Sequence, residues 1–238
     1  MFAFSLNTLE EPQIIAYFED VDTLESKKSR IVYRKIRLIN IDNPSKLKSE
    51  IEKSITDNEN GGFIYTLDSN KKILHGTSID NFRIVRCVNN DIILKGIVWN
   101  ESLGYHKVLK MKLNNEINEK YLWKKLKKNE LQGWLGFAFQ TQRTVIDREN
   151  IKIKLDGSLF DNMDEFYCAL GEEINGSGGY FGRNGNALAD CFCGGFGVKS
   201  ISEIIWINHQ RSKELLKDRF DMVIEIFKER KNLNLILQ

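Results

Sequence analysis

The part of the sequence from residue 151 onward alternates between short apolar runs and helix-like patterns. Runs rich in Ile and Leu occur at 151–155, 203–208 and 233–237, and each predicts a β-strand. Strands that are separated by helices favour parallel pairing through right-handed crossovers. The order of these runs therefore predicts an α/β unit.

Two helices are predicted between these strands. The first begins near Asn162, which is followed three residues later by Glu165, as in a capping box. Its apolar face repeats at i, i+3, i+4 and i+7 and consists of Met163, Phe166, Tyr167 and Leu170. The second is one long helix between 208 and 233. Its predicted buried stripe is Leu216, Phe220, Val223, Ile224 and Phe227, and its acidic face is Glu214, Asp218, Asp221, Glu225 and Glu229.

The first part of the chain, residues 1–145, has a different pattern, typical of a β-rich α+β domain. Helices are predicted at 43–55 and 115–130, and a hairpin turn at 88–91. Apolar runs with strand character occur at 13–18, 30–41, 61–67, 82–88, 91–99 and 106–113. The polar segment 141–150 separates this domain from a second one at 150–238, and the role of the first domain is open.

Composition places the chain among ordinary globular proteins, with 42% hydrophobic and 29% charged residues in 238 positions. We expect no secretory signal and no membrane span. Four cysteines are too few for a disulfide scaffold in a chain of this length, so we expect a reduced, cytoplasmic protein. Residues 1–150 hold 24 Lys and Arg against 20 Asp and Glu, and residues 151–238 hold 11 against 13. This asymmetry is too mild to indicate nucleic acid binding.

The stretch "GGYFGRNGNALADCFCGG" at 178–195 contains glycines, aromatic residues and two cysteines that could suggest several kinds of chemistry. Its glycines do not fit G-x-G-x-x-G, and no P-loop lysine follows. Cys191 and Cys193 lack a second ligand pair, because His75, His106 and His209 stand apart from any ligand cluster. No hydrolase motif occurs. We therefore predict a protein that is not an enzyme, with no catalytic residue, no metal and no cofactor.

A basic and aromatic stretch, "KYLWKKLKK" at 120–128, could contact phosphates and stack bases. The alternative is an amphipathic helix whose lysines face water while Ile117, Tyr121, Leu122 and Leu126 pack inward. We favour this second interpretation and do not expect direct nucleic acid binding, although binding through the first domain stays open as a hypothesis.

A short helix starting near Asn184, within the stretch 178–195, presents two different faces. Helical spacing turns Ala187, Leu188, Cys191 and Phe192 inward, and it turns Arg183, Asn186, Asp190 and Cys193 outward with Ala189 at the edge. Tyr180 and the glycines precede the helix. An aromatic residue, amides and one central carboxylate around a helix start are typical of a protein interface.

Residues 151–238 resemble the barstar family of ribonuclease inhibitors. The resemblance is carried by "LDGS", "DEFYCAL", "YFGRN…AL.DC", "SKEL", "VIEIFKE" and the terminal strand. It implies a three-stranded parallel sheet with helices, and a protein that inhibits a nuclease by binding it. The inhibitory surface that it implies consists of the short helix starting near Asn184, the loop before it and a glutamate on the last helix.

The resemblance assigns a partner-binding role to Tyr180, Asn184, Asp190, Gly194 and Glu229. It implies that the central aspartate, Asp190, occupies the phosphate site of the nuclease. The family surface has an aspartate, a tryptophan and a threonine where this chain has Asn186, Ala189 and Cys193, which we include in the predicted surface. One charge and one large aromatic contact are thereby lost.

Two functions follow from this comparison. The first is an immunity or antitoxin protein that blocks a nuclease toxin, most simply a ribonuclease. The second is a regulatory module that binds a partner other than a nuclease, which the changes at Asn186 and Ala189 suggest. The sequence does not indicate an oligomeric state.

Overall fold

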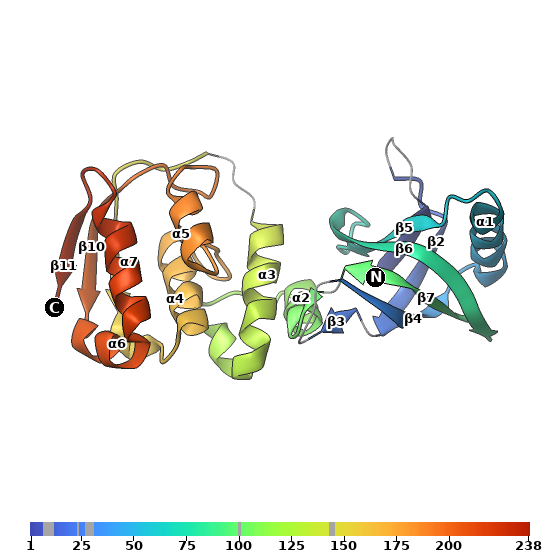
Figure 1. Cartoon of the computed structure of the whole chain (residues 1–238), viewed down its shortest axis with the longest axis horizontal. Coiled ribbons are helices and arrows are strands. Elements are labelled where there is room, and N and C mark those ends of the chain that lie inside the picture. The colour runs from blue at the N-terminus through green and yellow to red at the C-terminus, as the bar shows by residue number, and fades with distance from the viewer. Residues whose placement is uncertain (7–11, 23, 27–30, 100, 143–145) are drawn as a thin grey trace. The chain divides into compact units, whose positions relative to one another are not determined.

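The computed structural model of the chain describes residues 1–6, 12–22, 24–26, 31–99, 101–142 and 146–238. Its backbone forms two compact units, Met1–Ser102 and Leu103–Gln238 (Figure 1). The first is rich in strands, and the second contains a parallel sheet with helices. The predicted combination of an α+β and an α/β architecture is therefore confirmed.

Unit 1 is a closed antiparallel β-barrel. The order β1-β2-β4-β7-β6-β5 returns to β1, so each of these strands pairs on both sides. Closure leaves the barrel without exposed strand edges. The strands are β1 (Phe2–Leu6), β2 (Ala16–Asp22), β4 (Ile31–Ile41), β5 (Gly61–Leu67), β6 (Ile73–Val88) and β7 (Asp91–Trp99). Two short strands, β3 (Glu25–Ser26) and β8 (Glu101–Ser102), pair in parallel.

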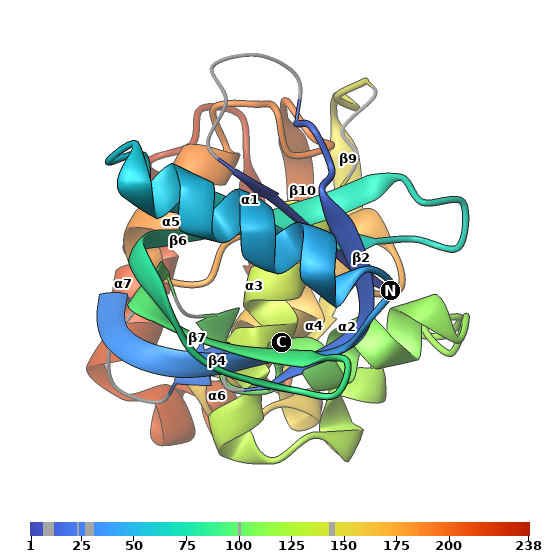
Figure 2. The same cartoon turned by 90° about the vertical axis from the view of Figure 1, so that its right-hand side faces the viewer.

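Helix α1 (Pro44–Thr56) confirms the helix predicted at 43–55. The Asn43 side chain accepts a hydrogen bond from the backbone N–H of Lys46, and Pro44 occupies the first turn, so both favour a helix start here. The helix lies across the front of unit 1 in Figure 2 and buries Leu47 and Ile51. The hairpin between β6 and β7 turns at Asn89, whose φ is 51°, as predicted for 88–91.

Unit 2 is built on the predicted three-stranded parallel sheet, whose order is β11-β10-β9. The strands are β9 (Ile151–Asp156), β10 (Ile201–Ile207) and β11 (Asn234–Leu237). Central strand β10 carries Trp206, which is fully buried and whose ring packs against Phe166 and Phe220 with centroids 5.6 and 5.0 Å away. The Trp206 indole donates to Ser212 Oγ, so its one polar atom is satisfied.

The helices of unit 2 agree with the sequence except in one place. Helix α4 (Met163–Asn175) starts at Asn162, whose side chain accepts from the backbone N–H of Glu165, as predicted. The single long helix predicted between 208 and 233 is wrong, because it is two helices, α6 (His209–Leu216) and α7 (Asp218–Lys228). The chain turns at Lys217, whose φ is 51°. The predicted apolar stripe is nevertheless buried on both sides of this turn.

Residues 103–142 belong to unit 2, and both elements predicted within them are wrong. The expected strand at 106–113 is helix α2 (Tyr105–Leu113), because its buried residues recur at i, i+3 and i+4. The expected helix at 115–130 is replaced by two short 3₁₀ turns, η1 (Leu122–Lys125) and η2 (Lys128–Glu130). Helix α3 (Leu131–Thr141) was not predicted, because it is apolar on most sides and shows no polar face.

The compact second unit therefore starts at Leu103, well before the boundary expected at 141–150. Residues 143–145 of that expected boundary lie outside the described residues. Helix α3 packs on α4, and Gln132 Nε2 donates to the Asp164 carboxylate. In Figure 1, α3 lies on the side of α4 and α5 that faces away from the sheet.

A fully buried carboxylate, Glu172 on α4, fastens this additional segment to the sheet and its helices. It accepts hydrogen bonds from the backbone N–H of Tyr121 at 2.6 Å, from Trp123 Nε1 at 3.1 Å and from the backbone N–H of Gly178 at 2.9 Å. Burial raises the pKa of Glu172, and the three donors act in the opposite direction. One side chain thus joins η1, α4 and the loop that follows α4.

Replacing Glu172 by alanine should lower the free energy of unfolding by roughly 3 kcal/mol or more. One buried N–H group, of Trp123, and two part-buried ones, of Tyr121 and Gly178, lose their acceptor, and an unsatisfied buried group costs about 1–3 kcal/mol. Urea unfolding of the full chain measures this change. Glu225→Ala is the matched control, because Glu225 is exposed on α7 and its loss should change the unfolding free energy by less than about 0.5 kcal/mol. Equal stability of the two variants would contradict the proposed role of Glu172.

Candidate functional site

The candidate surface is centred on α5 (Gly185–Cys191), the helix predicted to start near Asn184. Asn184 is its N-cap, and the Asn184 side chain accepts from the backbone N–H of Ala187 at 2.9 Å. The preceding Gly182 has a φ of +97°, and a Cβ there would lie 2.8 Å from Leu188 Cα, so only glycine fits this approach. The loop and the cap together fix where α5 starts.

The two predicted faces of α5 are present. Leu188 and Cys191 are buried, and Asn186, Asp190 and Cys193 are exposed. Ala187, Ala189 and Phe192 are intermediate, so the inner face is narrower than expected. Helix α5 packs on α7, where the Phe192 and Phe227 ring centroids are 5.9 Å apart. This packing fixes which face of α5 points outward.

Asp190 is the only charged residue between Arg183 and Lys199. Its carboxylate forms no ion pair with the residues that the structure describes, although the side chain lies on a rigid helix. An exposed carboxylate in this state keeps both oxygens available for an incoming guanidinium or ammonium group, with which it can form charge-assisted hydrogen bonds. Asn186, one turn earlier on the same face, offers an amide and no charge.

Glu229 supplies a second exposed carboxylate, at the C-terminal cap of α7. It lies 3.6 Å from Arg230 Nη2 and its side chain is 71% exposed, so this ion pair leaves it accessible. The Arg230 guanidinium lies 5.3 Å from the centroid of the Phe192 ring, directly after α5. Glu229 and the end of α5 are therefore linked through Arg230.

Tyr180 does not lie where the sequence predicts. It is 2% exposed, although we expected an accessible aromatic side chain before the helix. Phe139 and Phe196 cover it, with ring centroids 5.2 and 5.9 Å away, and burial raises the pKa of its hydroxyl to about 12. Phe139 comes from α3, which the sequence pattern did not reveal, so this cover could not be anticipated.

Gly194 follows α5 in a conformation with a φ of +97°. The loop after it is held by Asp147, whose carboxylate accepts from the backbone N–H groups of Gly195 at 2.6 Å and Gly197 at 2.9 Å. Sequence reasoning missed Asp147, because a single acidic residue in a polar segment carries no local signal. Gly194 thus lies beside a carboxylate that is already committed to backbone donors.

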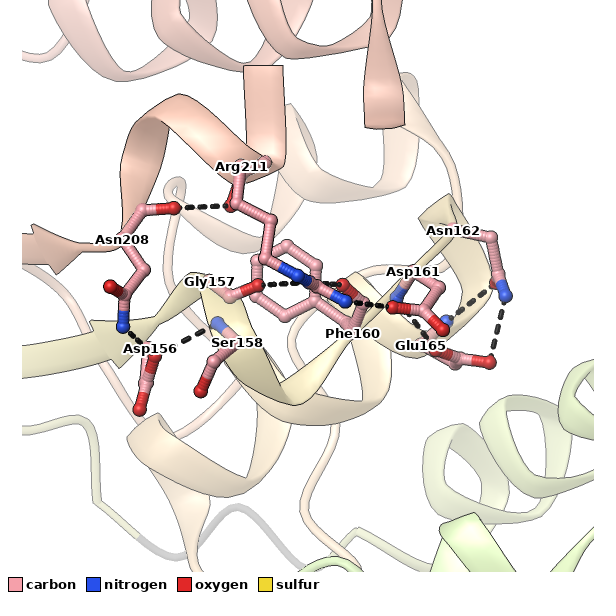
Figure 3. Close-up of polar contacts among 10 residues, drawn as sticks. Asp156, Gly157, Ser158, Phe160, Asp161, Asn162, Glu165, Asn208 and Arg211 are labelled. Carbon is pink, nitrogen blue, oxygen red and sulfur yellow. Dashed lines mark hydrogen bonds and ion pairs between the residues drawn. The ribbon is translucent and has the colours of Figure 1, made fainter. Parts of the chain in front are cut away.

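A second group of polar residues, at the turn between β9 and α4, proves to be structural (Figure 3). The Arg211 guanidinium donates to the carbonyls of Gly157 and Phe160 and to the Asp161 carboxylate. Asp156 accepts from the backbone N–H of Ser158 and from Asn208 Nδ2. These groups satisfy one another, and their hydrogen bonds hold the "LDGS" turn against the start of α6.

The other chemistries considered from sequence gain no support from the described part of the chain. No group of three or more His, Cys, Asp or Glu side chains is close enough there to hold a metal ion. The rings of "KYLWKKLKK" are poorly placed for base stacking. Trp123 is 1% exposed, and the Tyr121 hydroxyl donates a hydrogen bond to the Glu173 carboxylate. Within the same residues, no helix has the length and apolar character that a membrane crossing requires.

Comparison with known proteins finds one family that matches this part of the chain. Residues 151–234 match the family model Barstar, described as barnase inhibitor. No family match covers the N-terminal domain, and no curated protein matches the chain. The match includes α5 and α7 with Asp190 and Glu229, whereas α2 and α3 lie outside it.

Thiol reagents should distinguish Cys193 from its neighbour Cys191. Cys191 is 1% exposed and burial raises the pKa of its thiol to about 12, so at pH 8 it stays protonated and shielded. Cys87 and Cys193 are exposed and should be alkylated rapidly in the native protein, whereas Cys168 and Cys191 should react only after unfolding. Peptide mass spectrometry after brief iodoacetamide treatment reads each site. Labelling of Cys191 as fast as Cys193 would contradict the inward face of α5.

Proposed function

We propose that this barstar-like chain is an immunity protein, an inhibitor that binds a ribonuclease toxin and blocks its active site. The observation that carries the proposal is the exposed carboxylate of Asp190 on a rigidly capped helix. It stands in the part of the chain that matches a family of ribonuclease inhibitors. The role requires no catalysis by the inhibitor, because occupying the cleft is sufficient.

The mechanism follows from the chemistry of a carboxylate. A ribonuclease holds the phosphate of RNA with Arg, Lys or His side chains, and a carboxylate offers two oxygens to the same donors. Asp190 would accept these hydrogen bonds in place of the phosphate, so RNA and the inhibitor would compete for one site. Desolvation on binding strengthens such a pair, and truncating one partner leaves the other charge buried and unpaired.

The remaining predicted residues surround this central contact. Asn184 and Asn186 offer amides at the start of α5. Ala189 lies on α5, and Cys193 and Gly194 follow its last residue. Glu229 adds a second negative charge from α7. Tyr180 is buried, so in this proposal it packs beneath the surface residues and does not contact the partner.

The alternative function is a regulatory module that binds a protein other than a nuclease. It is favoured by Asn186 and Ala189, which make the outer face of α5 less charged and less aromatic than the family surface. We also propose a cytoplasmic location, since all four cysteines are free and two of them are exposed, which suits a reducing compartment.

Substituting Asp190 by alanine should weaken ribonuclease binding at least about 30-fold, the loss expected when one member of a buried charge pair is removed. Immobilised wild type and variant are exposed to lysate and culture supernatant of the source organism. Eluted fractions are then assayed for RNA cleavage with and without added inhibitor. We expect a ribonuclease that the wild type retains and inhibits at one-to-one stoichiometry, and that Asp190→Ala loses.

Glu214→Ala is the matched control, because it removes one exposed carboxylate from α6 in the same unit. It should bind like the wild type. A retained partner without nuclease activity would favour the regulatory alternative, and equal retention by Asp190→Ala would place the binding surface elsewhere.

The complex should also protect one exposed cysteine and leave the other reactive. Cys193 lies at the end of α5 inside the proposed contact, whereas Cys87 is exposed on β6 of unit 1. Alkylation of Cys193 should slow at least about tenfold when the ribonuclease is bound, because the contact excludes the reagent from the interface core. Unchanged labelling of Cys193 in the complex would count against this face.

A further inference from the structure

Three aromatic rings gather at the two loops that flank α5. Phe139, on the last turn of α3, has its ring centroid 5.2 Å from that of Tyr180 and 6.3 Å from that of Phe196. Tyr180 precedes α5 and Phe196 follows it. Tyr180 is fully buried in this cluster, whereas Phe139 is 46% exposed. Phe139 is therefore the ring that the cluster presents to solvent.

Hydrogen bonds fix α3 against these loops. Gln142, directly after α3, accepts from the backbone N–H of Tyr180 at 2.7 Å and donates through Nε2 to the Phe196 carbonyl at 3.0 Å. Asn175, at the end of α4, donates to the carbonyls of the same two residues. The position of Phe139 is thus set by contacts to the backbone on both sides of α5, which limits the entropy lost when a partner docks.

Phe139 is also in contact with the residue that leads into α5. The Arg183 guanidinium lies 5.9 Å from the centroid of the Phe139 ring, and Arg183 immediately precedes the N-cap Asn184. Arg183 therefore connects the aromatic cluster to the start of α5. The Asp190 carboxylate is exposed on α5, and the half-exposed Phe139 ring lies on α3.

The outer face of α5 lacks an exposed aromatic side chain of its own. Its outward residues are small or amide-bearing apart from Asp190 and from Arg183, whose guanidinium lies over the Phe139 ring, and Tyr180 is buried. Protein interfaces usually derive most of their affinity from a few aromatic or arginine side chains near the centre of the contact. The half-exposed ring of Phe139, next to the residue that leads into α5, is an aromatic side chain of this kind.

We propose that α3 is part of the partner-binding surface and that Phe139 is its aromatic anchor. The inference rests on the proposed function and commits to the same partner, a ribonuclease whose cleft receives Asp190. In this proposal Phe139 contacts the ribonuclease beside the cleft, while Asp190 meets the cationic groups inside it. The segment that precedes the family match thereby supplies an aromatic contact that α5 does not provide.

The test compares binding of one probe, the ribonuclease recovered with the wild-type chain, to four full-length variants by calorimetry. Phe139→Ala should weaken binding about tenfold, as expected for loss of an interface aromatic. Leu215→Ala is the matched control, because Leu215 is similarly exposed, at 42%, on α6. In Figures 1 and 2, α6 lies at the opposite end of unit 2 from α5, so this change should alter the affinity less than twofold.

Phe139→Leu separates a loss of binding from a loss of folding, because leucine keeps an apolar side chain over Tyr180 but removes the aromatic ring. It should fold with a melting temperature near that of the wild type and still bind at least about threefold more weakly. Wild-type affinity in both folded Phe139 variants would overturn the proposal for α3. If Asp190→Ala at the same time loses binding, the ribonuclease inhibitor proposal stands and only the role of α3 is rejected.

The converse outcome separates the two proposals in the other direction. If Phe139→Ala and Phe139→Leu weaken binding while Asp190→Ala binds like the wild type, α3 is a contact surface but the phosphate-site mechanism is rejected. If none of the variants changes the affinity, both proposals fail.

Discussion

The buried carboxylate of Glu172 connects the three segments on which the proposed binding surface depends. It accepts hydrogen bonds from η1, through Tyr121 and Trp123, and from the loop after α4, through Gly178. That loop leads through Tyr180 and Gly182 into the N-cap of α5, so its position decides where α5 begins. A carboxylate with no solvent exposure is costly unless its oxygens are satisfied. Here three N–H donors satisfy the carboxylate, and two of them, from Tyr121 and Trp123, lie in a segment outside the family match.

The surface built on this support combines a charge and an aromatic ring on different elements. Asp190 projects from α5, Glu229 from the end of α7, and Phe139 from α3. Loops on both sides of α5 are fixed by Gln142, Asn175 and Asp147. Because these loops are already fixed, binding of the proposed partner should order little additional backbone, and less of the interaction energy is lost to entropy.

The sequence was sufficient to predict the elements that have a clear capping residue or a clear apolar repeat. The capping Asn162 and Asn184, the parallel strands and the outward position of Asp190 all follow from local spacing. Helix α3 could not be predicted, because burial on most sides removes the polar face that reveals a helix. The buried state of Tyr180 depends on α3 and was missed for the same reason. The break at Lys217 was missed because the apolar spacing continues across it.

The account depends most on whether α5 occupies the site that binds the phosphate of RNA. Inhibition kinetics test this directly, with purified chain, the ribonuclease that it retains, and RNA at several concentrations. Because Asp190 and phosphate would need the same cationic groups, the apparent inhibition constant should rise in proportion to the RNA concentration above the Michaelis constant. An inhibition constant that does not change with RNA concentration would show that inhibitor and RNA bind at different places, which contradicts the central claim.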